Sequence, residues 1–116
     1  MSTRTNVGSV EDLHASATKA CGLDDFGSDD DNYREALAVL LDSYTRDADL
    51  TEIGSKMNRF FVRNALVARL VSEAAFKQYP QHTDVAIERP IFVTGLPRTG
   101  TTVIHRLLTA DPAHQG

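Results

Sequence analysis

The chain has 116 residues, of which 41% are hydrophobic and 24% charged, so it can bury a core but is long enough for one domain at most. Its formal net charge of −4 divides into −7 for residues 1–50 and +3 for residues 51–116, a balance too weak to indicate a nucleic-acid-binding protein. The longest apolar run, Ala36–Leu41, is too short to span a bilayer.

The N-terminal sequence and the cysteine content bear on the cellular compartment. The first nine residues, MSTRTNVGS, contain no apolar stretch and so do not resemble a signal peptide. Cys21 is the single cysteine, so it cannot form an internal disulfide, and it offers no metal-ligand spacing. We therefore expect a cytoplasmic protein that has no membrane span and binds no metal.

A first helix is predicted over residues 10–21. Ser9, followed by two acidic residues, is typical of a helix start, and Gly22 is typical of a C-terminal stop. The loop Leu23–Asn32 then carries five aspartates. Because it lacks the glycine and glutamate spacing of an EF-hand, we interpret this cluster as caps for the next helix rather than as a calcium site.

Two further helices follow in the same region. Apolar residues recur at helical spacing from Tyr33 to about Arg46. The same spacing predicts a long helix from Thr51 to Gln78, which Pro80 ends.

The long helix carries one apolar stripe, which we expect to pack in a core rather than to bind a cofactor. Arg59 and Arg63 lie off this stripe, and we interpret them as a solvated cationic face rather than a ligand site. The stripe consists of Ile53, Met57, Phe60, Phe61, Asn64, Val67, Val71 and Ala74.

A strand–loop–helix unit is predicted near the end of the chain. After the connector Gln81–Pro90, the β-branched segment Ile91–Thr94 is typical of a buried strand. Gly95–Gly100 is a glycine loop, and a helix is predicted from Thr101 to about Ala110. Its expected packing side is formed by Val103, Ile104, Leu107 and Leu108.

The glycine loop is suited to bind an anion. The first turn of a helix has backbone N–H groups without internal partners, and the helix dipole adds positive potential there. Gly100 permits an unusual φ and a close approach of the backbone, whereas Pro97 stiffens the loop without offering an N–H group. The expected donors are the amides of Arg98, Thr99, Gly100, Thr101 and Thr102, the hydroxyls of Thr101 and Thr102, and the Arg98 guanidinium.

The nearest general pattern is the P-loop of nucleotide triphosphatases, G-x-x-x-x-G-K-[ST]. Gly95 and Gly100 match its glycines, but Thr101 stands where that pattern has the lysine that reaches the β- and γ-phosphates. This replacement disfavours ATP or GTP hydrolysis. The cation of this sequence is instead Arg98, which lies within the loop, before Gly100.

These residues resemble a known family. The run PRTGTT at Pro97–Thr102 is similar to the 5′-phosphosulfate-binding loop of sulfotransferases, P-[KR]-[ST]-G-T-T. The wider run Arg89–Pro112 resembles bacterial sulfotransferases in particular. The preceding LDDFG and MNRFFVRNALVARL segments also resemble the helical lead-in of such proteins.

The resemblance implies a donor, a reaction and site residues. The donor would be 3′-phosphoadenosine 5′-phosphosulfate (PAPS), and the complete enzyme would transfer its sulfonate, without a metal, to a hydroxyl or amine of a small-molecule acceptor. Arg98 would be the catalytic residue that stabilises charge on the leaving phosphate. The PAPS-binding residues would be Pro97, Arg98, Thr99, Gly100, Thr101 and Thr102. His105 lies one turn further along the helix, and we expect it to be an ordinary helix residue rather than the catalytic base.

The fold expected from these features is an α/β fold of the P-loop nucleotide-binding type. Residues 1–86 would form a helical region of about three helices, and residues 87–116 would begin the parallel sheet with its first strand–loop–helix unit. The 3′-phosphate site and the base would lie further along a longer enzyme, so we expect the 116-residue chain to be an inactive fragment. Two alternatives remain open, namely another P-loop enzyme such as a small-molecule kinase and a non-catalytic helical interaction fragment.

Overall fold

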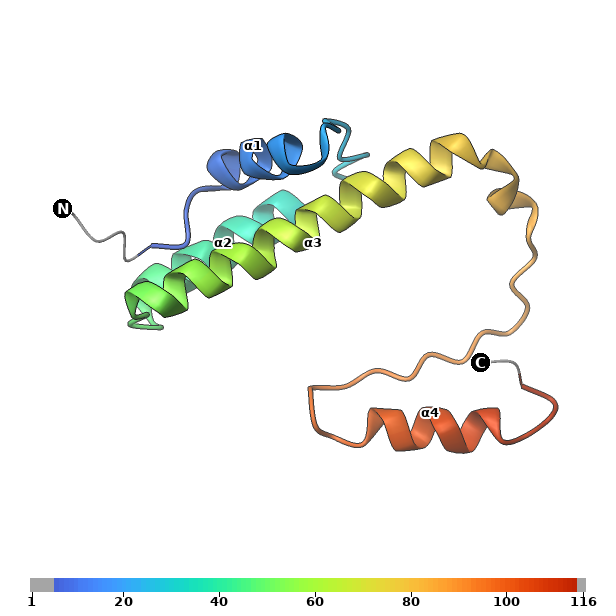
Figure 1. Ribbon diagram of the computed structural model, residues 1–116. Helices are drawn as coiled ribbons and strands as arrows, with labels where there is room; N and C mark the ends of the chain where they lie inside the picture. Colours follow the sequence, from blue (N-terminus) through green and yellow to red (C-terminus); the bar gives the residue numbers. More distant parts are fainter. Residues whose placement is uncertain (1–5, 115–116) are drawn as a thin grey trace. The chain divides into compact units, whose positions relative to one another are not determined.

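The computed structural model describes residues 6–114 and divides into two compact units (Figure 1). The first unit ends at His82 and holds three α-helices, and the second begins at Thr83 and holds one. The boundary that the sequence suggested, between residues 86 and 87, stays a prediction.

Helix α1 spans Val10–Cys21, as predicted. Ser9 caps its start, because the Ser9 hydroxyl accepts a hydrogen bond of 3.1 Å from the backbone N–H of Asp12. Gly22 caps its end with a left-handed φ of 73°, and its N–H donates to the Thr18 carbonyl. The local signals at both ends of this helix were therefore sufficient to place it.

Helices α2 and α3 also confirm the sequence prediction. Helix α2 spans Tyr33–Arg46 and α3 spans Glu52–Gln78. The Thr51 hydroxyl caps α3 by accepting a 3.1 Å hydrogen bond from the N–H of Gly54. A short 3₁₀ helix, Pro80–Asp84, follows α3.

The core of the first unit forms around α1, which packs against both α2 and α3 (Figure 1). Apolar side chains from all three helices and from the segments beside them are buried together. They are Val7, Leu13, Ala17, Phe26, Leu37, Leu41, Leu66 and Leu70.

The buried face of α3 is not the predicted stripe. Leu66, Leu70 and Ser55 are buried, whereas the stripe residues Ile53 and Phe61 are 71% and 60% exposed. Helix α3 has two apolar faces, and an ion pair accompanies the contact of one of them with α1. Arg59 donates to Asp12 over 2.6 Å and to the Val7 carbonyl over 3.0 Å, so it is a packing residue and not part of a solvated face.

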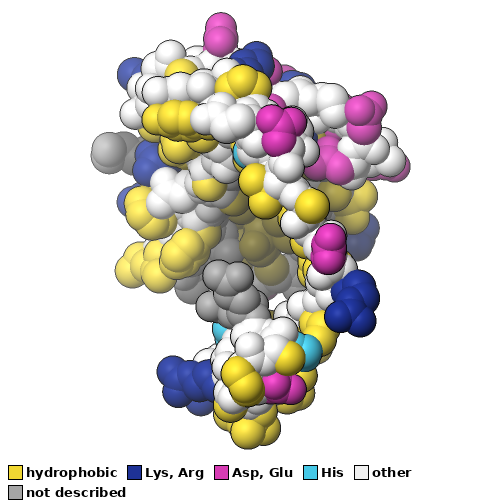
Figure 2. Space-filling model, turned by 90° about the vertical axis from the view of Figure 1, so that its right-hand side faces the viewer, with side chains coloured by type: hydrophobic (Ala, Val, Ile, Leu, Met, Phe, Trp, Pro, Cys, Tyr) yellow, Lys and Arg dark blue, Asp and Glu magenta, His cyan; other side chains and the backbone are white. Residues whose placement is uncertain are grey.

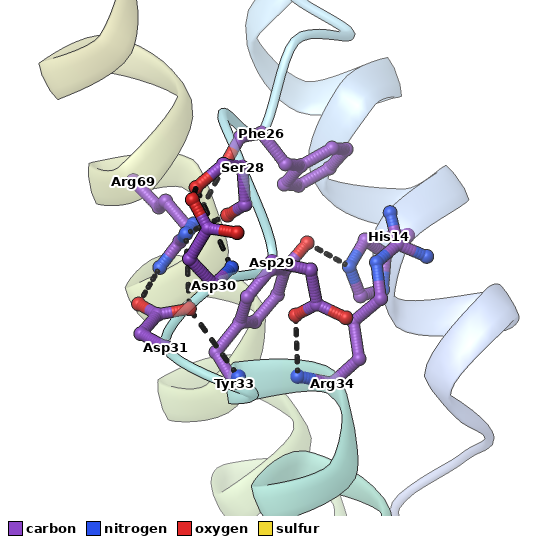
Figure 3. Close-up of polar contacts among 9 residues, drawn as sticks. All are labelled: His14, Phe26, Ser28, Asp29, Asp30, Asp31, Tyr33, Arg34 and Arg69. Carbon is purple, nitrogen blue, oxygen red and sulfur yellow. Dashed lines mark hydrogen bonds and ion pairs between the residues drawn. The ribbon is translucent and has the colours of Figure 1, made fainter.

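The aspartate loop between α1 and α2 is tied to α3 by Arg69 (Figure 3). Its guanidinium pairs with Asp31 over 2.8 Å and also donates to the carbonyls of Phe26 and Ser28, each over 2.7 Å. The carboxylates of Asp29 and Asp31 accept hydrogen bonds from backbone N–H groups at the start of α2. The capping role predicted for this cluster is confirmed.

A buried histidine joins the same region. The Nδ1 atom of His14 lies 2.7 Å from the Val10 carbonyl oxygen. Its Nε2 atom lies 3.0 Å from the Tyr33 hydroxyl oxygen (Figure 3). The Tyr33 ring also has the Arg69 guanidinium above it, 3.9 Å from the ring centroid. These contacts link α1, α2 and α3 through side chains far apart in the sequence.

The second unit consists of an extended segment, a turn and helix α4, Thr101–Thr109. The predicted strand at Ile91–Thr94 is not shown: no strand forms within residues 6–114, and the segment is not buried, since Phe92 is 84% exposed. A strand needs a neighbour for its N–H and C=O groups, and the described residues supply none. For the same reason the packing side of α4 lacks a partner, and Leu107 is 69% exposed.

Over residues 6–114, none of the helices combines the length and the apolar character that crossing a bilayer requires.

Candidate anion-binding loop

The predicted loop lies between the extended segment and α4, and it forms a tight turn. The Thr99 hydroxyl donates a hydrogen bond of 2.6 Å to the Leu96 carbonyl, which closes the turn. A Cβ atom on Gly95 would lie 2.9 Å from the Thr99 hydroxyl oxygen and 3.0 Å from the Thr101 methyl carbon. A larger residue at position 95 would therefore crowd these two threonine side chains.

Two residues of the loop have left-handed backbone conformations. Gly100, the N-cap of α4, has a φ of 90°, and Arg98 has a φ of 65°. A positive φ is ordinary for glycine but costs free energy for arginine. Strain of this kind at a non-glycine residue is often found where a loop is shaped for a ligand.

The start of α4 offers N–H groups to an anion. No side chain caps the helix, and the first bonds of its N-terminal turn run from Val103 and Ile104 to the Gly100 carbonyl. Among the described residues, the N–H groups of Gly100, Thr101 and Thr102 have no acceptor. Unpaired donors at a helix N-terminus, together with the dipole, favour a bound oxyanion.

The remaining site residues lie as follows. Arg98 is exposed within the same turn as the free N–H groups, and Thr101 is half-buried. His105 is exposed one turn along α4 and lines a hollow of about 740 Å³ in the second unit, together with Glu88, Arg89 and His114. The structure thus brings Pro97–Thr102 into one turn, and it leaves His105 outside that turn.

Sequence reasoning missed two features of the loop. We did not predict the hydrogen bond from the Thr99 hydroxyl to the Leu96 carbonyl. A threonine hydroxyl that donates to the carbonyl three residues earlier is nevertheless a known turn pattern. The positive φ of Arg98 was also missed, because arginine gives no sequence signal for that conformation.

Comparisons with known proteins agree on one family. Residues 90–116 match the family model described as the sulfotransferase family. A solved structure, sulfotransferase STF1 from Mycobacterium tuberculosis H37Rv, is 73% identical over 97% of this chain, with a TM-score of 0.87. The chain spans 31% of the length of that structure's chain. No curated protein sequence matches the chain.

Proposed function

Because the chain belongs to the sulfotransferase family, we propose that its Pro97–Thr102 loop binds the phosphosulfate end of PAPS in an enzyme that transfers a sulfonate group. When bound, PAPS would supply the sulfonate and a bisphosphate leaving group. The proposed acceptor is a small molecule with a hydroxyl or an amine, and the proposed location is the cytoplasm.

One observation carries the proposal: among the described residues, three consecutive backbone N–H groups, Gly100–Thr102, lack acceptors where the loop meets the start of α4. Such a set of donors can hold phosphate or sulfate oxygens without contributing any charge of its own. The Thr101 and Thr102 hydroxyls can donate to the same oxygens. We assign the 5′-phosphate to these groups.

Arg98 supplies the positive charge of the proposed site. It is the cation nearest in sequence to the free amides, and its planar guanidinium can donate two parallel hydrogen bonds to a phosphate or sulfonate. Fixed donors that face developing negative charge lower an activation barrier without reorganising during the reaction. We therefore assign Arg98 the stabilisation of charge on the leaving phosphate.

In the complete enzyme we propose that Ile91–Thr94 becomes a strand of a parallel sheet, followed by the loop and α4 in P-loop order. The exposure of Phe92 and Leu107 supports this, because apolar side chains on an extended segment and on its following helix need a covering layer. The segment 1–86 would then be the helical region that precedes the sheet.

Calorimetric titration of the 116-residue chain with PAPS and with ATP, each with and without Mg²⁺, tests the proposal. We expect saturable binding of PAPS that does not require Mg²⁺, and weaker binding of ATP. A small-molecule kinase would show Mg²⁺-dependent binding of ATP instead. Absence of PAPS binding by a chain with intact helical circular dichroism would remove support for the assigned loop.

A further inference from the structure

The hydroxyl of Thr99 differs from those of Thr101 and Thr102, because it already has a partner inside the loop. It donates to the Leu96 carbonyl over 2.6 Å. A threonine hydroxyl has one hydrogen to donate. In this geometry that hydrogen points to the carbonyl, so the hydroxyl would turn only lone pairs toward a bound oxyanion. The Thr99 side chain is therefore unsuited to be a direct ligand of the anion.

The Thr99 bond spans the residue that has the unfavourable backbone conformation. It joins the first and fourth residues of the turn Leu96–Thr99, in which Pro97 is second and Arg98, with a φ of 65°, is third. A proline in second place and a positive φ in third are features of a type II turn, whose third residue is usually glycine or asparagine. An arginine there costs free energy, so the turn needs a restraint that keeps Arg98 from relaxing to a negative φ.

Packing does not supply this restraint. Leu96 is 77% exposed, and Val103 and Leu107 on α4 are 61% and 69% exposed. Hydrophobic side chains such as these lie at the molecular surface (Figure 2). Within residues 6–114, the Thr99 bond is the one side-chain hydrogen bond made in the glycine loop. The same hydroxyl oxygen would lie 2.9 Å from a Cβ on Gly95, so it also sits against the backbone at the start of the loop.

We propose that Thr99 is a positioning residue of the anion site. Its hydroxyl holds Arg98 in the left-handed conformation and so sets the direction of the guanidinium relative to the amides of Gly100–Thr102. Donors that are ordered before the ligand arrives bind it more tightly, because less freedom is lost on binding. This inference rests on the proposed function, since it concerns how the same loop is held ready for PAPS.

Calorimetric titration of variants of the 116-residue chain with PAPS tests the inference. Thr99→Val keeps the branched side chain but removes the hydroxyl, and we expect it to bind about fivefold to tenfold more weakly. Thr99→Ser keeps the hydroxyl and should bind within about twofold of the parent chain. The matched control is Thr109→Val, because the Thr109 hydroxyl also donates to a carbonyl three residues earlier, that of Arg106, at the other end of α4. This control should bind like the parent.

Nuclear magnetic resonance of the free chain separates positioning from direct contact. A residue with a positive φ holds its own amide hydrogen close to its Hα, which gives a strong nuclear Overhauser effect within that residue. We expect this signal at Arg98 in the parent and in Thr99→Ser, and a weaker signal in Thr99→Val before PAPS is added. Circular dichroism confirms that each variant keeps its helices.

The outcomes distinguish this inference from the proposed function. Weaker PAPS binding by Thr99→Val with an unchanged Arg98 signal would make the hydroxyl a direct ligand and overturn the positioning role. Equal binding by Thr99→Val and the parent, or binding by Thr99→Ser as weak as that by Thr99→Val, would overturn it while leaving the proposed function intact. Absence of PAPS binding by the parent chain would instead remove the proposed function, and this inference with it.

Discussion

Arg98 has a positive φ of 65°. Its guanidinium is the only side-chain cation among the residues of the proposed site, Pro97–Thr102. The backbone conformation is unfavourable for any residue with a Cβ, so a residue chosen for the turn alone would be glycine or asparagine. Arginine at this position therefore favours a role for the guanidinium.

Replacing Arg98 tests that role. Arg98→Ala should weaken PAPS binding by about tenfold to a hundredfold, because a charge-assisted bidentate contact contributes on the order of 1.5–3 kcal/mol. Arg98→Gly should lose binding to a similar extent although it relieves the backbone strain. Arg106→Ala, in the last turn of α4, is the matched control and should bind like the parent chain. Equal binding by all three variants in calorimetry would show that the guanidinium does not contact the donor.

A substitution of Gly100 tests whether the backbone conformation of the same turn matters for PAPS binding. A Cβ at this position meets no atom within 4 Å, so Gly100→Ala introduces strain at a φ of 90° without a steric clash. We expect a cost of about 1 kcal/mol, seen as roughly fivefold weaker PAPS binding.

The matched variant is Gly22→Ala, because Gly22 also has a positive φ of 73° and open space around it. It should lower the melting temperature of the helical unit and leave PAPS binding unchanged. The opposite pattern, with Gly22→Ala impairing binding and Gly100→Ala neutral, would contradict the assigned site.

At the scale of elements, the contact between the aspartate loop and α3 makes the helical unit sensitive to acid. A hydrogen bond from Arg69 holds the pKa of Asp31 below its usual value of 3.8. A carboxylate whose pKa is lowered by folding stabilises the fold above the unfolded-state pKa, and this stabilisation is lost as pH falls through the lower folded-state value. The pKa of Glu11 is also lowered, first by a backbone hydrogen bond at the start of α1.

We therefore expect thermal stability to be nearly independent of these two groups above about pH 5, and to fall progressively from about pH 4 downward. Asp31→Asn should reduce the loss of thermal stability at low pH. Protonation of Glu11 should account for a further part of that loss. Arg69→Gln should lower stability at pH 7 and also reduce the acid dependence. Melting curves followed by circular dichroism from pH 7 to pH 2 measure the effect. An unchanged pH profile for Asp31→Asn would contradict the role of the ion pair.

The sequence predicted the helices well because their signals are local. Ser9, Gly22 and Thr51 act on neighbouring backbone groups, so the bounds of α1 and α3 follow from the residues beside them. The buried face of α3 could not be predicted, since both of its faces are apolar. The buried face is the one that packs with residues far apart in the chain, where Leu66 and Leu70 join the core residues of α1 and α2.

The candidate loop was predictable as a glycine turn before a helix, and the structure places Pro97–Thr102 there. Whether the preceding segment, Ile91–Thr94, forms a strand could not be predicted from its β-branched residues alone. Strand formation also depends on partner strands. The sequence pattern indicates a preference for an extended conformation within a sheet. The part of the chain that the structure describes contains no strand that could pair with this segment.

At the scale of the whole molecule, the chain has two units with uncovered apolar surfaces and spans 31% of a related sulfotransferase. The proposed binding of the donor's phosphosulfate end involves the loop residues Pro97–Thr102. Transfer also needs a base and an acceptor pocket, which no residue of the chain has been assigned to supply.

We therefore predict that the 116-residue chain binds PAPS but transfers no sulfonate. Incubation with sulfur-labelled PAPS and a panel of hydroxyl- and amine-bearing acceptors measures this, with the label followed by chromatography. Labelled product above the level of a protein-free control would contradict the prediction and place the whole catalytic apparatus within these residues.

The most direct test of the account follows the individual backbone amides of the ¹⁵N-labelled chain by nuclear magnetic resonance during titration with PAPS. We predict saturable shifts concentrated on the amides of Arg98–Thr102, with small shifts in α1, α2 and α3. Unchanged loop amides at saturating PAPS, or changes spread evenly over the helices, would contradict the claim that this turn holds the donor's phosphosulfate.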